Sequence, residues 1–145
     1  MELRNISKEE LDKIIDNHKK WLQSNGEEGE RADLRYADLS YANLSYADLR
    51  YADLSYANLR YADLRYADLS YANLDFSAFP LWCGGLDVHI DDKQATQLLY
   101  HLVRNVKYSK NTSAKLKRIC KIKSLVKQAN EFHRSKECGE IKEEQ

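Results

Sequence analysis

A period of five residues dominates this chain and limits what it can fold into. From Ala32 to Phe79 the sequence repeats a small residue, Asp or Asn, a large apolar residue, Ser or Arg, and an aromatic residue, as in ADLSY at 52–56. On a helix at roughly 100° per residue, the leucines would advance by about 500° per repeat and would not share a face. In an extended chain the Ala and Leu of one pentad share a face, but five is odd, so unbroken alternation would reverse the face at each repeat. The period therefore predicts one corner per pentad and stacked coils whose backbones hydrogen-bond to one another.

The repeated units YADLR, YADLS and YANLS closely resemble the pentapeptide repeat proteins, whose A(D/N)LXX signature folds into a right-handed, four-sided β-helix with one pentad per side. Nine consecutive pentads from Ala32 to Leu74 have Ala, Asp or Asn, and Leu in place, and a tenth at 77–79 carries Phe in the Leu position. The resemblance covers about a third of the chain. It implies a short right-handed quadrilateral β-helix of about 2.5 coils. With the helices that the flanking sequence predicts, one N-terminal and two C-terminal, the expected fold is a mainly β solenoid capped by α-helices.

A four-sided coil implies that residues twenty apart stack on one another. The expected interior ladder consists of Leu34, Leu39, Leu44, Leu49, Leu54, Leu59, Leu64, Leu69, Leu74 and Phe79. The expected exterior aromatic ladder consists of Tyr36, Tyr41, Tyr46, Tyr51, Tyr56, Tyr61, Tyr66 and Tyr71, whose rings would stabilise the corners by stacking. The same register sets Asp33 over Asp53 and Asp48 over Asp68, which predicts a mild repulsion screened by solvent. A fifteen-residue repeat overlies the five, and this near-identity indicates either recent duplication or a designed consensus.

The flanking segments are expected to cover the ends of the stack. A capping box at Ser7–Glu10 predicts a helix that ends at Asn25-Gly26, with His18 at the polar edge of its apolar face. The sequence predicts a compact turn over 80–85, a second helix after Asp91, and a third helix over about 113–132. The expected domains are therefore 1–30, a capping helix and linker; 31–79, the repeat; and 80–145, a turn, two helices and a frayed tail after about residue 135.

The charges are balanced overall but unevenly distributed. The chain has 23 basic and 23 acidic residues, yet 101–138 carries 11 Lys or Arg against two Glu. The candidate partner surface is the basic face of the third helix, with Lys115, Lys117, Arg118, Lys121, Lys123 and Lys127. A basic amphipathic helix can bind nucleic acid or an acidic membrane surface. The alternative is a solvated face that balances the acidic N-terminal half. The broad apolar stripe of this helix also predicts pairing of two chains through the C-terminal helices.

The sequence contains few residues in patterns typical of catalytic or metal-binding sites. Its three cysteines are irregularly spaced, and neither they nor the histidines form a paired metal-binding motif. The repeated Asp residues are better suited to hydrogen bonding at corners than to catalysis. We therefore expect no enzymatic activity, no catalytic or metal site and no cofactor. The lack of an apolar signal core or a membrane-spanning run predicts a cytoplasmic protein.

These observations predict a non-enzymatic scaffold or protein-interaction module whose partner is unknown. The resemblance raises one alternative, because some pentapeptide repeat proteins mimic duplex DNA and bind type II topoisomerases such as gyrase. A stack about 12 Å tall, at roughly 4.8 Å per strand, argues against it, since it spans under four base pairs of about 3.4 Å each. Five Arg residues also offset most of the seven Asp residues in the repeat. A second alternative is nonspecific nucleic-acid binding through the basic C-terminal helix.

Overall fold

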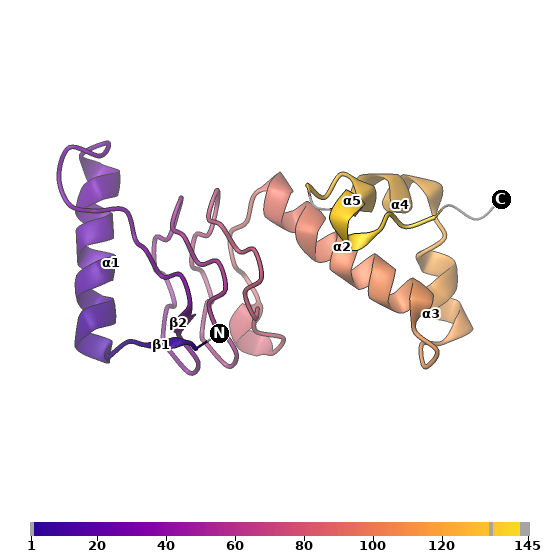
Figure 1. Cartoon of the computed structure of the whole chain (residues 1–145), viewed down its shortest axis with the longest axis horizontal. Coiled ribbons are helices and arrows are strands. Elements are labelled where there is room, and N and C mark those ends of the chain that lie inside the picture. The colour runs from indigo at the N-terminus through magenta and orange to yellow at the C-terminus, as the bar shows by residue number, and fades with distance from the viewer. Residues whose placement is uncertain (1, 134, 143–145) are drawn as a thin grey trace. The chain divides into compact units, whose positions relative to one another are not determined.

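A computed structural model describes residues 2–133 and 135–142, and the chain divides into two units, Met1–Asp91 and Asp92–Gln145 (Figure 1). The first unit contains β1 (Arg4–Asn5), α1 (Lys8–Gln23), β2 (Ala37–Asp38) and a 3₁₀ helix (Cys83–Gly85). The second contains α2 (Asp92–Tyr108), α3 (Ala114–Ile119), α4 (Lys123–Asn130) and α5 (Ser135–Cys138). Each unit has its own cluster of buried apolar side chains.

The prediction of a mainly β solenoid is wrong. Regular strands within the described residues are confined to β1 and β2, which form a two-stranded parallel sheet with Arg4 opposite Ala37. Most residues in regular secondary structure are instead helical, and there are five α-helices in the described part of the chain rather than the three expected. The physical reason is the corner in each pentad, which leaves an extended stretch too short for a strand to propagate. The repeat segment is therefore a series of turns joined by isolated bridges rather than a quadrilateral β-helix of regular strands.

Single pairs of residues, twenty positions apart, join these turns into rungs. Isolated parallel bridges connect Asp33 with Asp53, Asp53 with Asn73, and Asp38 with Asn58. The Leu34 N–H donates to the Asp53 carbonyl at 2.8 Å, and the Asp53 N–H donates to the Ala32 carbonyl at 3.0 Å. The nine leucines from Leu34 to Leu74 lie inside, each no more than 7% exposed, and Phe79 packs against them partly buried. Backbone pairing and leucine packing therefore hold the rungs together.

Each corner places an aromatic residue in a backbone conformation that such residues seldom adopt. The Ala37 N–H donates to the Leu34 carbonyl at 3.2 Å, which closes a four-residue turn. Its third residue, Tyr36, has φ of 58°, the sign required in a type II turn. Positive φ recurs at all eight following aromatic corners, through Phe76 at 61°. Because each costs on the order of 1–2 kcal/mol for a residue with a side chain, compensating contacts must hold the corners.

The rungs continue past the last pentad, which sequence reasoning missed. The Leu64 N–H donates to the Gly84 carbonyl at 2.7 Å, and the Leu69 N–H donates to the His89 carbonyl at 2.8 Å. The indole N–H of Trp82 also donates to the Ala62 carbonyl, at 2.9 Å. Residues 80–91 therefore extend the pairing without the pentad motif, so no periodic signal in the sequence marks them.

The N-terminal end of the rungs is covered by α1 and β1 (Figure 1). The Ser7 side chain accepts a hydrogen bond from the Glu10 N–H at 3.1 Å, so α1 begins with a capped first turn. Leu11 is buried against the leucines of the rungs, with Ile14 and Ile15 partly buried beside it. The helix therefore removes from water an apolar end that the rungs alone would expose.

In the second unit, α2 packs against α4, and the helix predicted over 113–132 is divided. It ends after α3 and resumes at α4, with Ile122 in an extended conformation (φ −61°, ψ 116°) between them. The break allows Cys120, Val126 and Phe132 to join Tyr100 in one buried cluster. The tail expected to be frayed instead contains α5, and Ile141 is buried. The Tyr100 hydroxyl donates to the Gly139 carbonyl at 2.8 Å, while residues 143–145 of the predicted tail lie outside the described residues.

His18 is fully buried rather than at the polar edge of α1. Its Nδ1 accepts a hydrogen bond from the Ala32 N–H at 3.1 Å, and its ring stacks on Trp21 at 5.7 Å between centroids. Burial lowers the pKa of His18, although the negative charge of Asp48 acts to raise it. Because Nδ1 must stay unprotonated to accept this bond, α1 is held against the first rung by a neutral histidine.

We predict that the first unit loses stability as the pH falls. The unfolded chain protonates His18 near pH 6.5, while the folded chain resists protonation, so the stabilisation is complete above about pH 6.5 and is lost as pH falls through the lower folded pKa. Urea unfolding followed by tryptophan fluorescence at pH 7.5 and pH 5 measures this loss, which His18→Leu should reduce. His89→Gln, at an exposed position, is the control. The same pH dependence in both variants would contradict the assignment.

Candidate functional site

The polar surface of the repeat starts from one contact made in every pentad. The Asp53 Oδ1 accepts a hydrogen bond from the Ser55 N–H at 3.0 Å, across the corner. The same contact, from the residue two positions later to the Asp or Asn oxygen, recurs in all nine pentads from Asp33 to Asn73. Asp and Asn both offer this oxygen, which explains why the repeat accepts either residue. These side chains are therefore structural acceptors first.

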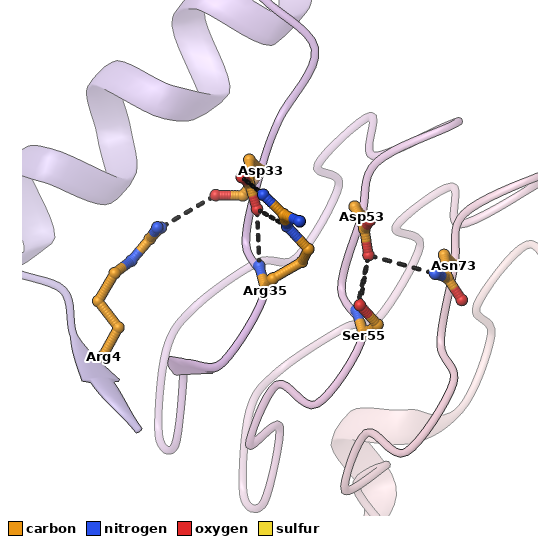
Figure 2. Close-up of polar contacts among 6 residues, drawn as sticks. All are labelled: Arg4, Asp33, Arg35, Asp53, Ser55 and Asn73. Carbon is orange, nitrogen blue, oxygen red and sulfur yellow. Dashed lines mark hydrogen bonds and ion pairs between the residues drawn. The ribbon is translucent and has the colours of Figure 1, made fainter. Parts of the chain in front are cut away.

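Figure 2 shows how neighbouring rungs share these side chains. The guanidinium of Arg35 contacts both oxygens of Asp33, at 2.8 and 2.6 Å, and Arg4 donates to the Asp33 carbonyl at 2.9 Å. On the next rung, Asp53 accepts from the Ser55 hydroxyl at 2.7 Å and from the Asn73 amide at 3.3 Å. An Asn above an Asp thus supplies a donor where a second carboxylate would repel.

Arginine side chains lie beside the stacked aspartates and offset the expected repulsion between them. Arg50 lies between Asp48 and Asp68, with its Nε 2.8 Å from an Asp48 oxygen and 3.8 Å from an Asp68 oxygen. The hydrogen-bonded Arg35 side chain lowers the pKa of Asp33 to about 2, and Arg65 does the same for Asp63. A carboxyl group with so low a pKa is a poor proton donor or acceptor near neutral pH. These pairs therefore serve charge balance rather than acid–base chemistry.

The tyrosines form stacked pairs outside the rungs. Ring centroids lie 4.6–4.9 Å apart in the pairs Tyr36–Tyr56, Tyr41–Tyr61, Tyr46–Tyr66, Tyr51–Tyr71 and Tyr56–Phe76. Two of these pairs, at the corners of residues 41 and 61 and of residues 46 and 66, bound one face of the repeat made by 42–45 and 62–65. We call this surface the tyrosine face. The indole N–H of Trp82 donates to the carbonyl of Ala62, at the start of this face.

The six basic residues predicted as a partner surface do not share one helix. Lys115, Lys117 and Arg118 lie on α3, Lys121 follows it, and Lys123 and Lys127 lie on α4. The structure brings three of them together in a hollow of about 370 Å³ lined by Lys107, Ala114, Lys117, Arg118 and Lys121. Sequence reasoning missed Lys107, which lies in the last turn of α2, because only the packing of α2 on α3 brings it there.

The described part of the chain assembles no group of side chains that could hold a metal ion. No cluster of three or more His, Cys, Asp or Glu residues that could bind a metal ion occurs among residues 2–133 and 135–142. Cys83 and Cys138 are exposed free thiols, and Cys120 is a buried one. None of the helices described is both long enough and apolar enough to cross a membrane.

We predict that the acceptor oxygen of Asp53, rather than its charge, stabilises the first unit. Asp53→Ala should cost about 1–2 kcal/mol in the free energy of unfolding, because the N–H of the buried Ser55 loses its partner. Asp53→Asn keeps the oxygen and should cost less than about 0.5 kcal/mol. Urea unfolding of the two variants measures the difference, and equal losses would show that the carboxylate charge matters instead.

We also predict that Asp63 titrates at about 2 in the folded chain, because Arg65 favours its ionised form. Arg65→Gln should move this pKa towards the ordinary 3.8, while Asp33 stays at about 2 as the internal control. The stabilisation from the pair is present above pH 4 and is lost as the pH falls towards 2. Carboxyl ¹³C NMR titration measures both pKa values, and an unchanged Asp63 in the variant would rule out Arg65 as the cause.

Comparison with known proteins identifies the repeat. Residues 42–75 match pentapeptide repeats in eight copies. Comparisons with curated proteins and with solved structures find no match. Tandem repeats of this kind generally form structural or interaction modules rather than enzymes. The resemblance inferred from the sequence is therefore confirmed over residues 42–75, which match the pentapeptide repeats.

Proposed function

We propose that this chain is a non-enzymatic scaffold that binds another protein through the tyrosine face. The supporting observation is that the large aromatic side chains of this face lie in solvent. The exposed fractions are 75% for Tyr41, 74% for Tyr46, 58% for Tyr61 and 47% for Tyr66. Aromatic side chains are enriched at protein interfaces. Tyrosine in particular buries a large amphipathic surface while losing little conformational entropy.

The tyrosine face is ordered before a partner arrives. Both pairs of rings that bound it stack at 4.9 Å, and hydrogen bonds between rungs fix the backbone beneath them. Between the corners the face carries Asn43 and Ser45 on one rung, with Asp63 and its paired Arg65 on the next. A partner therefore meets a rigid surface that has aromatic borders and a polar centre, which reduces the entropy lost on binding.

DNA mimicry towards a type II topoisomerase such as gyrase is a weaker proposal. Mimicry needs a continuous acidic surface, whereas Arg35, Arg50 and Arg65 each pair with an Asp two positions earlier at 2.6–2.7 Å. These contacts reduce the field that would attract a DNA-binding groove. Inhibition of gyrase supercoiling by an equimolar amount of the chain would favour mimicry over a protein-binding scaffold.

Pairing of two chains through the C-terminal helices is also a proposal, with reduced support. The apolar stripe that motivated it is divided, since Cys120, Val126 and Ala129 are buried within their own chain. Leu116 and Ile119 stay exposed, but lysines surround them. A monomer mass in light scattering at tens of micromolar would exclude this pairing.

We predict that removing one tyrosine pair abolishes capture of a partner from extracts of the native host. The test variant is Tyr46→Ser with Tyr66→Ser, which strips one border of the tyrosine face. The matched control is Tyr51→Ser with Tyr71→Ser, a neighbouring pair with the same 4.9 Å stacking. Mass spectrometry should identify a protein bound by the wild type and the control but lost from the test variant.

Equal recovery of every bound protein by the two variants would contradict the proposed face. Recovery of no protein above a bead control, with the unmutated chain as bait, would contradict the scaffold proposal itself. Circular dichroism of both variants checks that each stays folded, since each loses one stack that contributes about 0.5–1.5 kcal/mol and the control also loses the edge contact of Tyr51 with Trp21.

A further inference from the structure

The helix α3 buries none of its residues, although half of them are apolar. No residue of Ala114–Ile119 is buried, and Leu116 and Ile119 are 47 and 49% exposed. Ile122, in the extended link before α4, is 52% exposed. Leu116 and Ile119 are three residues apart, so they lie on neighbouring turns of one helix face. Leu116, Ile119 and Ile122 therefore lie outside the buried cluster of the second unit, although Cys120 between them joins it.

The same segment is strongly basic. Lys115, Lys117, Arg118, Lys121 and Lys123 alternate with the apolar residues, and the chain has no Asp or Glu at all from 93 to 130. The hollow of about 370 Å³ described above adds Lys107 from α2 to Lys117 and Arg118. Lys107 donates one hydrogen bond to the Lys142 carbonyl, and an ammonium group has two further donors. None of the five described residues that line this hollow is acidic, so an anion would complement its charge.

We propose that residues 113–123, which we call the basic apolar segment, bind the surface of an anionic lipid bilayer. Exposed apolar residues beside lysines are the composition that partitions into the boundary between headgroups and acyl chains. Leu116, Ile119 and Ile122 enter that boundary, while the lysines remain among the lipid phosphates. The hollow at Lys107 receives one phosphate-bearing headgroup.

A nucleic acid or a second copy of the chain would complement either the lysines or the apolar side chains of this segment, but not both. A nucleic acid provides phosphates, but it offers no apolar medium for three exposed aliphatic side chains, and the segment has no aromatic residue on which a base could stack. A second copy of the chain would cover the apolar side chains, but it would bring two sets of lysines together. An anionic bilayer meets both requirements at once. This proposal does not depend on the tyrosine face.

Co-sedimentation of the full chain with lipid vesicles tests the proposal. The chain should sediment with vesicles of phosphatidylserine and phosphatidylcholine, and should stay in solution with vesicles of phosphatidylcholine alone. Leu116→Ser with Ile119→Ser should abolish sedimentation, whereas Leu102→Ser, at an exposed position on α2, should leave it unchanged. Lys115→Gln with Lys117→Gln should weaken binding about 25-fold, at roughly fivefold per lysine near an anionic surface.

Several results would overturn the proposal. Absence of sedimentation with anionic vesicles would do so, as would equal binding to both vesicle types or an unchanged affinity in the Leu116/Ile119 variant. Tighter binding to a random DNA duplex than to vesicles, unaffected by that variant, would assign the lysines to nucleic acid. A dimer in light scattering that the variant dissolves would assign the apolar side chains to a second copy. Far-ultraviolet circular dichroism checks that each variant keeps its helices.

Discussion

The hydrogen bond from a corner N–H to an Asp or Asn oxygen is the interaction on which the first unit depends. It recurs in nine pentads and holds a turn whose third residue has positive φ. That conformation is costly for an aromatic residue, and ring stacking with the residue twenty positions away offsets part of the cost. Once the corners are held, Ala and Leu point inwards and the backbone pairs from rung to rung. Removing the corner acceptor would therefore weaken packing and pairing together.

The distribution of charge on the repeat is set by the Asp residues at the same corners. An Asp that caps its own turn retains a negative charge, and stacking at twenty residues brings such charges close together. The chain resolves this in two ways, with an Asn amide above Asp53 and with Arg50 between Asp48 and Asp68. The surface of the repeat is consequently a mixture of paired charges and exposed tyrosine rings. The second unit carries the opposite character, with thirteen basic and six acidic residues, and leaves its basic side chains around exposed aliphatic ones.

Local signals predicted some features of the chain, and others depended on contacts between distant segments. The five-residue period predicted one turn per pentad, but it also led to the wrong fold class, because the stretch between corners is too short to form regular strands. His18 was expected at a polar edge, since its buried position depends on the approach of Ala32. Residues 80–91 carry no pentads, so the sequence did not predict that they pair with the preceding rung. The helix expected over 113–132 breaks at Ile122, since packing on α2 selects which apolar residues are buried.

The sequence by itself determined where the chain turns and which side chains point inwards, because an odd period with one apolar pair per repeat has few solutions. It also determined that Asp and Asn are interchangeable at the corner, since both offer the same acceptor oxygen. The period of five does not specify how many pentads make a rung, so the stacking of rings twenty residues apart was expected only from the resemblance to a four-sided coil, and the tertiary structure has this spacing. Only the tertiary structure decided that Val126 is buried while Leu116 and Ile119 face water. All three residues are apolar, and whether each is buried depends on which neighbouring helix the fold packs against it.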